Sequence, residues 1–409
     1  MVQVSPKTTS SPPTKFISWF LAIIFTLAMV MIYVIPPSSQ VLFPAFAEVR
    51  ETGFYPDGLP VRRTYTGVYI LDEMCTGLAG LFSAASDGQD FATHLFCLWF
   101  LPQLCAVLTF IYWEAGKVES TQFRFARLPT FFGVLAQLIA AGPTLPLYFI
   151  SHIRGIPLVP NTIPKDAHIR ARVLLPAIIL GFVVPSAALF LVPSGSMSLD
   201  TKQIIAAIWQ PFPLYIAILY PLLAYGLQGI SSPVTSSKDN REAALKGIQV
   251  AYMASGILSS VAHWAIFLPA AFPSIFPSFI SGYTDPSVSF RHIFVPYILH
   301  PYLPTSISEI PEIAPYRLAA RLLFQHDWLY MTLAAFVFFA WHQASVARSY
   351  TGGADFVSWL TGVVVYTCIG GPGSAFCWAA IQREQVLSSI ISTQREIVED
   401  RSSTKGEKQ

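Results

Sequence analysis

Charged side chains are scarce in this sequence. Only 12% of its 409 residues are Asp, Glu, Lys or Arg, whereas 53% are hydrophobic. A soluble domain is nearer to a quarter charged. The charges gather between eight long stretches that hold none: Ile17–Ile35, Thr93–Trp113, Leu128–Ser151, Val173–Leu199, Gln203–Ser237, Gly247–Thr284, Trp328–Ala347 and Phe356–Gln382. Each can cross a bilayer core, which takes ~20 helical residues. Because lipid offers backbone polar groups no partner, we predict an all-α fold, a polytopic transmembrane helical bundle.

Motifs of the common catalytic and binding folds are missing as well. There is no P-loop, no G-x-G-x-x-G and no G-x-S-x-G. The aspartate-rich D-D-x-x-D sequence, which would supply Mg²⁺ to ionise a prenyl diphosphate, is also absent. The five cysteines form no C-x-x-C pair and the eight histidines no iron-binding cluster, so we expect neither metal nor cofactor. Without a basic stripe, nucleic acid is not an expected partner.

The chain is predicted to form one membrane domain, residues 17–382, between polar tails at 1–16 and 383–409. Thr64–Ser86 is a ninth candidate span, interrupted only by two acids. The segment Pro273–Asp327 holds eight prolines, which argues against one continuous helix there. Part of it, around Ile293–His300, is a tenth candidate. We therefore expect eight to ten spans, with the basic C-terminal tail in the cytosol.

The two acids of the ninth candidate span, Asp72 and Glu73, lie in "YTGVYILDEMCTGLAGLF" with no basic residue beside them. Neighbouring residues point about 100° apart on a helix, so the two carboxyls cannot share a face. Glu73 shares its face with Tyr69. One interpretation is that one acid caps the helix or reaches the interface while the other pairs with a distant arginine. The other is that Glu73 is a buried, protonated acid, which would make it a proton donor.

Two further acids extend this hypothesis. Glu114 ends the stretch Thr93–Trp113, and Asp327 follows His326 at the start of another. If Thr64–Ser86 spans the membrane and the proline-rich segment does not, all four acids meet at one membrane face. The alternatives are that Glu114 marks the water boundary and that Asp327 is an ordinary helix N-cap.

Aromatic residues make up 14% of the chain, and several lie close to these acids or within the apolar stretches. Aromatic faces attract a cation by roughly 0.5–2 kcal/mol each, and a dry pocket keeps water from quenching it. An acid in an aromatic cavity is therefore suited to generating and guiding a carbocation. The candidate substrate-binding residues, taken from these aromatics and from buried histidines, are Tyr69, Trp113, Tyr148, His263, Trp264 and His326.

Three segments carry a family resemblance: "LPQLCAVLTFIYWEAG", "LIAAGPTLPLYF" and "LLFQHDWLYMTLAAF". They resemble segments of the fungal integral-membrane terpene cyclases of meroterpenoid pathways, especially the ascochlorin/ascofuranone type. The resemblance implies a metal-independent, class II-like cyclisation, in which an acid protonates an epoxide or alkene of a prenylated aromatic substrate. The roles of Asp72, Glu73, Glu114 and Asp327 as catalytic acids are guided by their predicted burial. A multi-pass protein of the endoplasmic reticulum, in contact with membrane lipids, is the expected setting.

Two other classes of function stay open from the sequence. A proton-coupled small-molecule transporter would use the same acids as a proton relay, although no internal repeat is visible to support it. A non-catalytic membrane protein is the third possibility.

Overall fold

The computed structural model describes residues 14–35, 37–117, 125–156, 158–159, 164–192, 194–230, 236–275, 289–295, 315–347 and 355–406. Within these residues the chain is helical, and the β-structure is limited to one isolated bridge between Phe54 and Pro60. The all-α prediction is thus confirmed. The helices are α1 (Thr14–Met29), α2 (Phe43–Thr52), α3 (Tyr69–Ala84), α4 (Phe91–Lys117), α5 (Pro129–Ile139), α6 (Ala141–Gly155), α7 (Ala167–Ile178), α8 (Val184–Phe190), α9 (Leu199–Trp209), α10 (Phe212–Ile230), α11 (Ser237–Ala262), α12 (Leu268–Ala271), α13 (Phe290–Phe294), α14 (Pro315–Val346) and α15 (Asp355–Gly406).

Seven helical segments of the described chain are long and apolar enough to cross a membrane. Several of them join consecutive helices through π-helical turns such as η1 (Val30–Val34) and η2 (Pro37–Leu42). The segments are Thr14–Thr52, Phe91–Lys117, Ala167–Phe190, Phe212–Gly229, Lys238–Ala271, Tyr316–Val346 and Phe356–Thr393. The polytopic bundle is therefore confirmed, but the described residues hold fewer such helices than the eight to ten spans we predicted.

Helix α4 is the core of the bundle, because 89% of its apolar stretch is buried, against 22–50% for the other six segments. Large apolar side chains of the outer helices point away from the core instead. On α11 they recur every three or four residues, at Val250, Met253, Ile257 and Val261. Such an exposed apolar stripe is expected where a helix faces lipid.

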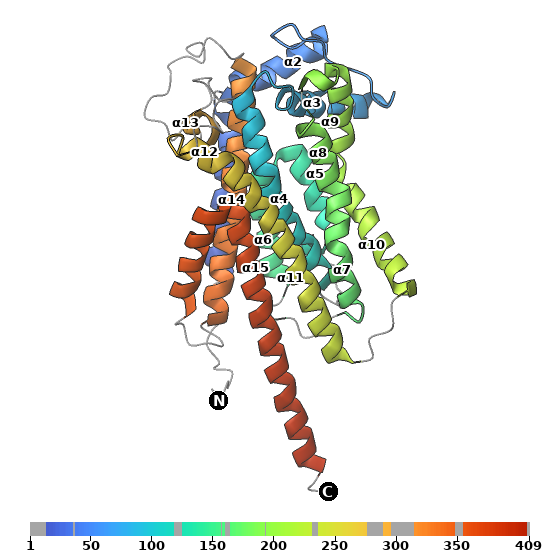
Figure 1. Cartoon of the computed structure of the whole chain (residues 1–409), viewed down its shortest axis with the longest axis vertical. Coiled ribbons are helices and arrows are strands. Elements are labelled where there is room, and N and C mark those ends of the chain that lie inside the picture. Colours follow the sequence, from blue (N-terminus) through green and yellow to red (C-terminus); the bar gives the residue numbers. More distant parts are fainter. Residues whose placement is uncertain are drawn as a thin grey trace.

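Two of the predicted spans, Leu128–Ser151 and Thr64–Ser86, do not form single helices long enough to cross a membrane. Leu128–Ser151 is not one helix, because the backbone of Ala140 adopts φ 68° and ψ 159° and separates α5, of 11 residues, from α6, of 15. Thr64–Ser86 contains α3, whose 16 residues are shorter than a typical span. Helix α3 packs against α9 and lies with α2 and α9 at one end of the bundle (Figure 1). The ninth candidate span is therefore an end cap of the bundle.

The long helix α15 includes the last of the seven segments, Phe356–Thr393, but its backbone is broken at Gly371, so Phe356–Gln382 is not the one continuous helix that we predicted. Gly371 has φ 82°, a left-handed conformation that ends the first arm. The rings of Tyr366 and Trp378 stack with their centroids 5.3 Å apart. In a straight helix these positions would be separated by about 18 Å along the axis. The two arms therefore form a hairpin, and the C-terminal arm extends beyond the other helices (Figure 1).

Side chains from α4 and from η6 (His263–Phe267), the π-helical turn that follows α11, hold the tip of this hairpin. The Gly373 N–H donates to Oε1 of Gln103 at 2.6 Å, and Trp264 Nε1 donates to the Ile369 carbonyl at 2.6 Å. His263 Nε2 lies 3.3 Å from the Cys368 carbonyl oxygen. These bonds satisfy backbone groups that the break leaves without helical partners. His263 and Trp264, which we predicted to bind substrate, thus contact the backbone of the hairpin tip.

Gly371→Ala tests this hairpin. An L-residue with φ > 0 costs about 1–2 kcal/mol, and a Cβ at this position would lie 3.0 Å from Nδ1 of His263. We expect the variant to lower the apparent Tm of the detergent-solubilised protein, measured by fluorescence-detected size exclusion after heating. Gly226→Ala in α10 is the matched control, since a Cβ there meets nothing within 4 Å. Equal Tm values for the two variants would contradict the hairpin.

Candidate active site

A cavity of about 450 Å³ lies between η1, α2, α3, α4, α5, α6 and α14. Helices α9 and α10 close one side of it. Its volume is in the usual range for small-molecule sites. The lining is dominated by apolar and aromatic side chains. The aromatic ones are Tyr33, Phe43, Phe46, Phe82, Phe100, Phe132, Tyr148, Trp209, Phe212 and Phe324.

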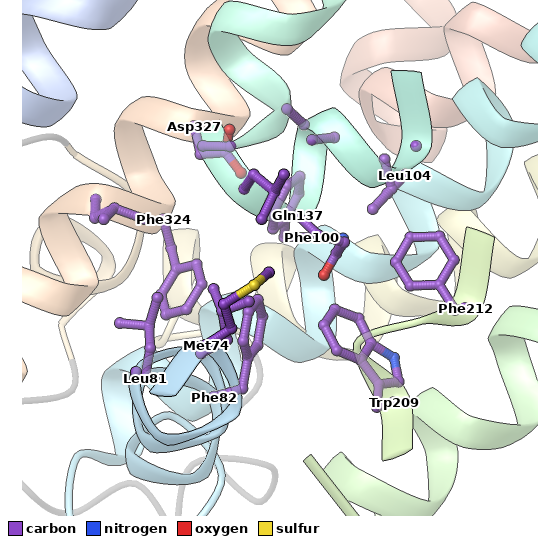
Figure 2. Close-up of a pocket in the computed structure, with 18 of the residues that line it drawn as sticks. Met74, Leu81, Phe82, Phe100, Leu104, Gln137, Trp209, Phe212, Phe324 and Asp327 are labelled. Carbon is purple, nitrogen blue, oxygen red and sulfur yellow. The ribbon is translucent and has the colours of Figure 1, made fainter. Parts of the chain in front are cut away.

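Four aromatic rings of the lining form a row, the aromatic wall, along one side of the cavity. Phe82 of α3 lies between Trp209 and Phe324, with centroid separations of 4.6 and 5.2 Å. Trp209 in turn contacts Phe212 at 5.3 Å. Figure 2 shows these rings surrounding the space below Asp327, with Phe100 between them. The wall exposes several ring faces and edges to whatever occupies the cavity.

Asp327 is the buried acid of this cavity. It lies inside α14, so the expectation that it caps its own helix is wrong. Its carboxyl group instead accepts a hydrogen bond from the Gly142 backbone N–H at the N-terminus of α6. Only 7% of the residue is exposed. Among the described residues no lysine, arginine or histidine forms an ion pair with it.

The local sequence explains why α6 meets Asp327 at this point. The unusual backbone of Ala140 turns the chain between α5 and α6, so that the first N–H groups of α6 face α14. Gly142 is required by the close approach, because a Cβ there would lie 2.9 Å from the Asp327 carbonyl oxygen. A non-glycine residue in the conformation of Ala140 is strained by about 1–3 kcal/mol, and such strain is common at functional sites.

Glu73 also lines the cavity, but in a different electrostatic setting. Its Oε2 lies 3.3 Å from Nε of Arg50, and the two side chains are 31% and 54% exposed, respectively. The ion pair joins α2 to α3 at the more open side of the cavity. The cavity therefore holds two acids, one buried without a cation and one half-exposed and paired.

Asp72 faces away from the cavity and organises the loop before α3. Its carboxylate accepts hydrogen bonds from the backbone N–H groups of Tyr65, Thr66 and Gly67 at 2.7–3.1 Å, and from the Thr66 hydroxyl. These bonds, led by that from the Thr66 N–H, lower the pKa of Asp72 below its usual value. Asp72 thus binds the backbone of the loop before α3 and does not cap the helix itself. Tyr69 is 77% exposed and does not line the cavity.

Comparison with known proteins places this architecture in a family. A family model for the CtvD domain matches residues 17–388. The chain belongs to the CtvD domain family. The terpene cyclase ctvD of Aspergillus terreus is 29% identical over 167 residues, which cover 39% of this chain and 46% of that protein. The terpene cyclase ascI of Acremonium egyptiacum is 24% identical over 212 residues, covering 51% and 53%. The chain thus spans about half the length of the curated relatives it matches, and no solved structure matches it.

In this CtvD-domain chain, Glu114 belongs to a second buried polar cluster rather than to the cavity. Its carboxylate oxygens lie 2.8 and 3.0 Å from the two terminal nitrogens of Arg383, and Oε2 lies 2.9 Å from His152 Nε2. Lys117 bridges Glu114 to Glu384, at 3.3 and 2.6 Å. The cluster ties α4 to α6 and α15. The two acids, Glu114 and Glu384, match the two basic residues, Lys117 and Arg383, in number. The charges of the cluster are therefore balanced without a ligand.

The expected meeting of four acids at one face does not occur. Asp72 and Glu73 lie near the start of α3, the helix that precedes α4, whereas Glu114 lies near the last turn of α4. With 27 residues, α4 is about 40 Å long. The prediction failed because it required α3 to cross the membrane and reverse the direction of the chain.

Trp113 and His326, two of the predicted substrate-binding residues, are buried outside the cavity lining. Trp113 lies beside Lys117, whose Nζ is 6.0 Å from the ring centroid. His326 stacks on Tyr330 at 6.1 Å. Of the candidate residues, the cavity brings together Glu73, Tyr148 and Asp327.

Sequence reasoning missed several cavity residues, including Arg50, Phe100, Gln137 and Trp209. The Gln137 amide within the apolar stretch Leu128–Ser151 was the clearest available signal, because a lone polar group in such a stretch usually faces the protein interior. In the described residues no group of three or more His, Cys, Asp or Glu side chains is arranged to hold a metal ion. Independence from metal stays a prediction.

The second cluster should be structural, and Arg383→Gln tests this. Removing the guanidinium leaves Glu114 buried without its main cation, which typically costs about 3–5 kcal/mol. We expect a large loss of folded protein in detergent, measured by size exclusion and thermal unfolding. Arg62→Gln is the control, because the Arg62–Asp200 pair is exposed and such pairs contribute about 0–1 kcal/mol. A stable, folded Arg383→Gln protein would contradict the structural role.

Proposed function

We propose that the chain is a membrane-bound terpene cyclase of the endoplasmic reticulum that starts cyclisation by protonating its substrate with Asp327. The observation that carries the proposal is a buried carboxyl without a cation, at the edge of an aromatic cavity. The names of the two curated relatives support the same activity. The substrate class is a lipophilic prenylated aromatic compound that enters from the membrane.

The first chemical step is a proton transfer. The Asp327 carboxyl gives its proton to the epoxide oxygen of the substrate, and the bond from that oxygen to the more substituted carbon breaks. A prenyl C=C bond or an internal hydroxyl oxygen then donates an electron pair to the carbon and closes a ring. A proton is finally lost to a base, so that the overall reaction is an isomerisation without an external oxidant or reductant.

Asp327 suits the donor role because of both its neighbours and its position. A carboxyl in apolar surroundings without a cation is more stable neutral than ionised. After the proton has left, the Gly142 N–H and the N-terminal end of α6 stabilise the carboxylate. The surroundings of Asp327 therefore suit both its protonated and its ionised form, and they do so without a second charged side chain.

The aromatic wall suits the cationic intermediate. Phe82, Trp209 and Phe324 are packed so that their rings line the same space. Each ring that lies against a cation contributes roughly 0.5–2 kcal/mol. An apolar lining also excludes the water that would trap the cation before the ring closes.

Glu73, predicted from the sequence to be the proton donor, is the second candidate for acid–base chemistry in the cavity. Its carboxylate lies 3.3 Å from Nε of Arg50, at the more exposed side of the cavity. In the proposed mechanism Glu73 is therefore better suited to accepting the terminal proton than to donating the first. Asp72 and Glu114, which face other partners, have no chemical role in this mechanism.

One observation favours the transporter alternative. A helix broken within an apolar hairpin is a feature of transporters, where unwound carbonyls coordinate an ion. Here the carbonyls of Cys368 and Ile369 are bonded to His263 and Trp264 instead. This pairing leaves the hairpin tip better suited to packing than to ion binding, so we favour the cyclase.

Asp327→Asn should reduce cyclisation by about 10²–10⁴-fold, the usual contribution of a general acid. The substitution keeps the shape and the hydrogen bond from Gly142 while removing the acid. The assay gives an epoxidised prenyl-aromatic substrate to membrane fractions and measures the cyclic product by mass spectrometry. Asp200→Asn is the matched control, since Asp200 is an exposed acid that does not line the cavity.

Glu73→Gln, assayed in parallel, identifies the donor. A small loss for Glu73→Gln beside a large loss for Asp327→Asn supports the assignment. The opposite pattern would transfer the donor role to Glu73. Normal product from both variants would remove the cavity acids from the mechanism.

A further inference from the structure

Two polar groups of the cavity are buried without a hydrogen-bond partner in the described structure. They are the hydroxyl of Tyr148 and the side-chain oxygen of Gln137. Tyr148 is fully buried, at 0% exposure. Buried polar atoms nearly always have a partner, and an unpaired one costs about 1–3 kcal/mol. Because both residues line the cavity, a molecule that occupies it can supply the missing partners.

The charges of the lining indicate what kind of polar group this is. Among the described residues that line the cavity, Arg50 is the single cationic side chain, and it is paired with Glu73. A diphosphate or carboxylate would therefore enter without a free cation to balance its charge, which is strongly unfavourable in apolar surroundings. A neutral hydroxyl or carbonyl group has no such requirement.

The two residues that carry these groups line the wall formed by α5 and α6. Phe132 of α5 packs edge-on against Tyr148 of α6, with centroids 5.2 Å apart. Figure 2 shows the Gln137 amide directed into the cavity, apart from Asp327. Along α6, Tyr148 is six residues beyond Gly142, which corresponds to about 9 Å of helix. Gln137 and Tyr148 thus line a different part of the cavity from Asp327.

We propose that Gln137 and Tyr148 recognise an uncharged, hydroxyl-bearing head group of the substrate while its prenyl end lies toward Asp327. This inference rests on the proposed function for the reacting end, but the recognition itself does not depend on turnover. The hydroxyl hydrogen of the ligand is donated to Gln137 Oε1, and the Tyr148 hydroxyl donates to an oxygen of the same head group. A ligand held in this way has its chain directed along the aromatic wall.

The test is a comparison of binding rather than of rate. A prenylated phenol and its deoxy analogue, with hydrogen in place of the hydroxyl, are titrated into the detergent-solubilised protein. Binding is followed by tryptophan fluorescence, since Trp209 lines the cavity. We expect the wild type to bind the phenol about tenfold more tightly, which corresponds to about 1.4 kcal/mol. In Gln137→Leu and Tyr148→Phe this preference should fall to about twofold or less.

Gln210→Leu and Tyr252→Phe are matched controls. Both residues carry buried side-chain atoms without a partner, as Gln137 and Tyr148 do, but neither lines the cavity. They should keep the tenfold preference. An unchanged preference in the Gln137 and Tyr148 variants, an equal loss in the controls, or no preference in the wild type would each overturn the proposal.

Cyclisation is measured on the same samples, so that the two proposals fail separately. A preference for the phenol without any cyclic product would leave the recognition in place and overturn the proposed function. Cyclic product together with equal affinity for both compounds would support the proposed function and overturn the recognition by Gln137 and Tyr148.

Discussion

The contact between Asp327 and the N-terminus of α6 is the constraint on which the site depends. A carboxyl group inside an apolar bundle needs a polar partner, and here the partner is the Gly142 backbone N–H. To supply it, the stretch Leu128–Ser151 must break between two short helices, and Ala140 takes a strained backbone conformation. The same break places Gln137, before it, and Tyr148, after it, on one wall of the cavity. The hydrogen bond from Gly142 to Asp327 thus accompanies both the strained backbone of Ala140 and the placement of Gln137 and Tyr148 on the cavity wall.

The bundle separates its charges into two groups with different consequences. Glu114, Lys117, Arg383 and Glu384 neutralise each other, and a balanced buried network fixes how α4, α6 and α15 pack. Asp327 has no such counter-charge among the described residues, and it faces a space of about 450 Å³. Burial alone therefore does not identify a functional acid. The absence of a nearby cation and the presence of a cavity distinguish the two.

Composition was enough to predict the fold class, because long stretches without charge in a chain of this length have few structural solutions other than membrane helices. Acids and aromatic residues in or near the apolar stretches also identified Glu73, Tyr148 and Asp327 as candidates. Their grouping was not predictable, since it depends on the backbone of Ala140, which divides an apparent span into α5 and α6, and on the packing of α3 at the end of the bundle. Arg50 and Trp209 come from distant segments, and only tertiary packing brings them to Glu73 and Phe82.

The central claim is that the cation forms in the aromatic cavity beside Asp327. The most direct measurement is a cryo-EM structure with an amine analogue of the substrate, in which an ammonium group replaces the cationic carbon. We predict density for the analogue within the cavity, its nitrogen facing Asp327 and its chain along Phe82, Trp209 and Phe324. Density at the Glu114–Arg383 cluster or on the outer surface of the bundle, with the cavity empty, would contradict the account.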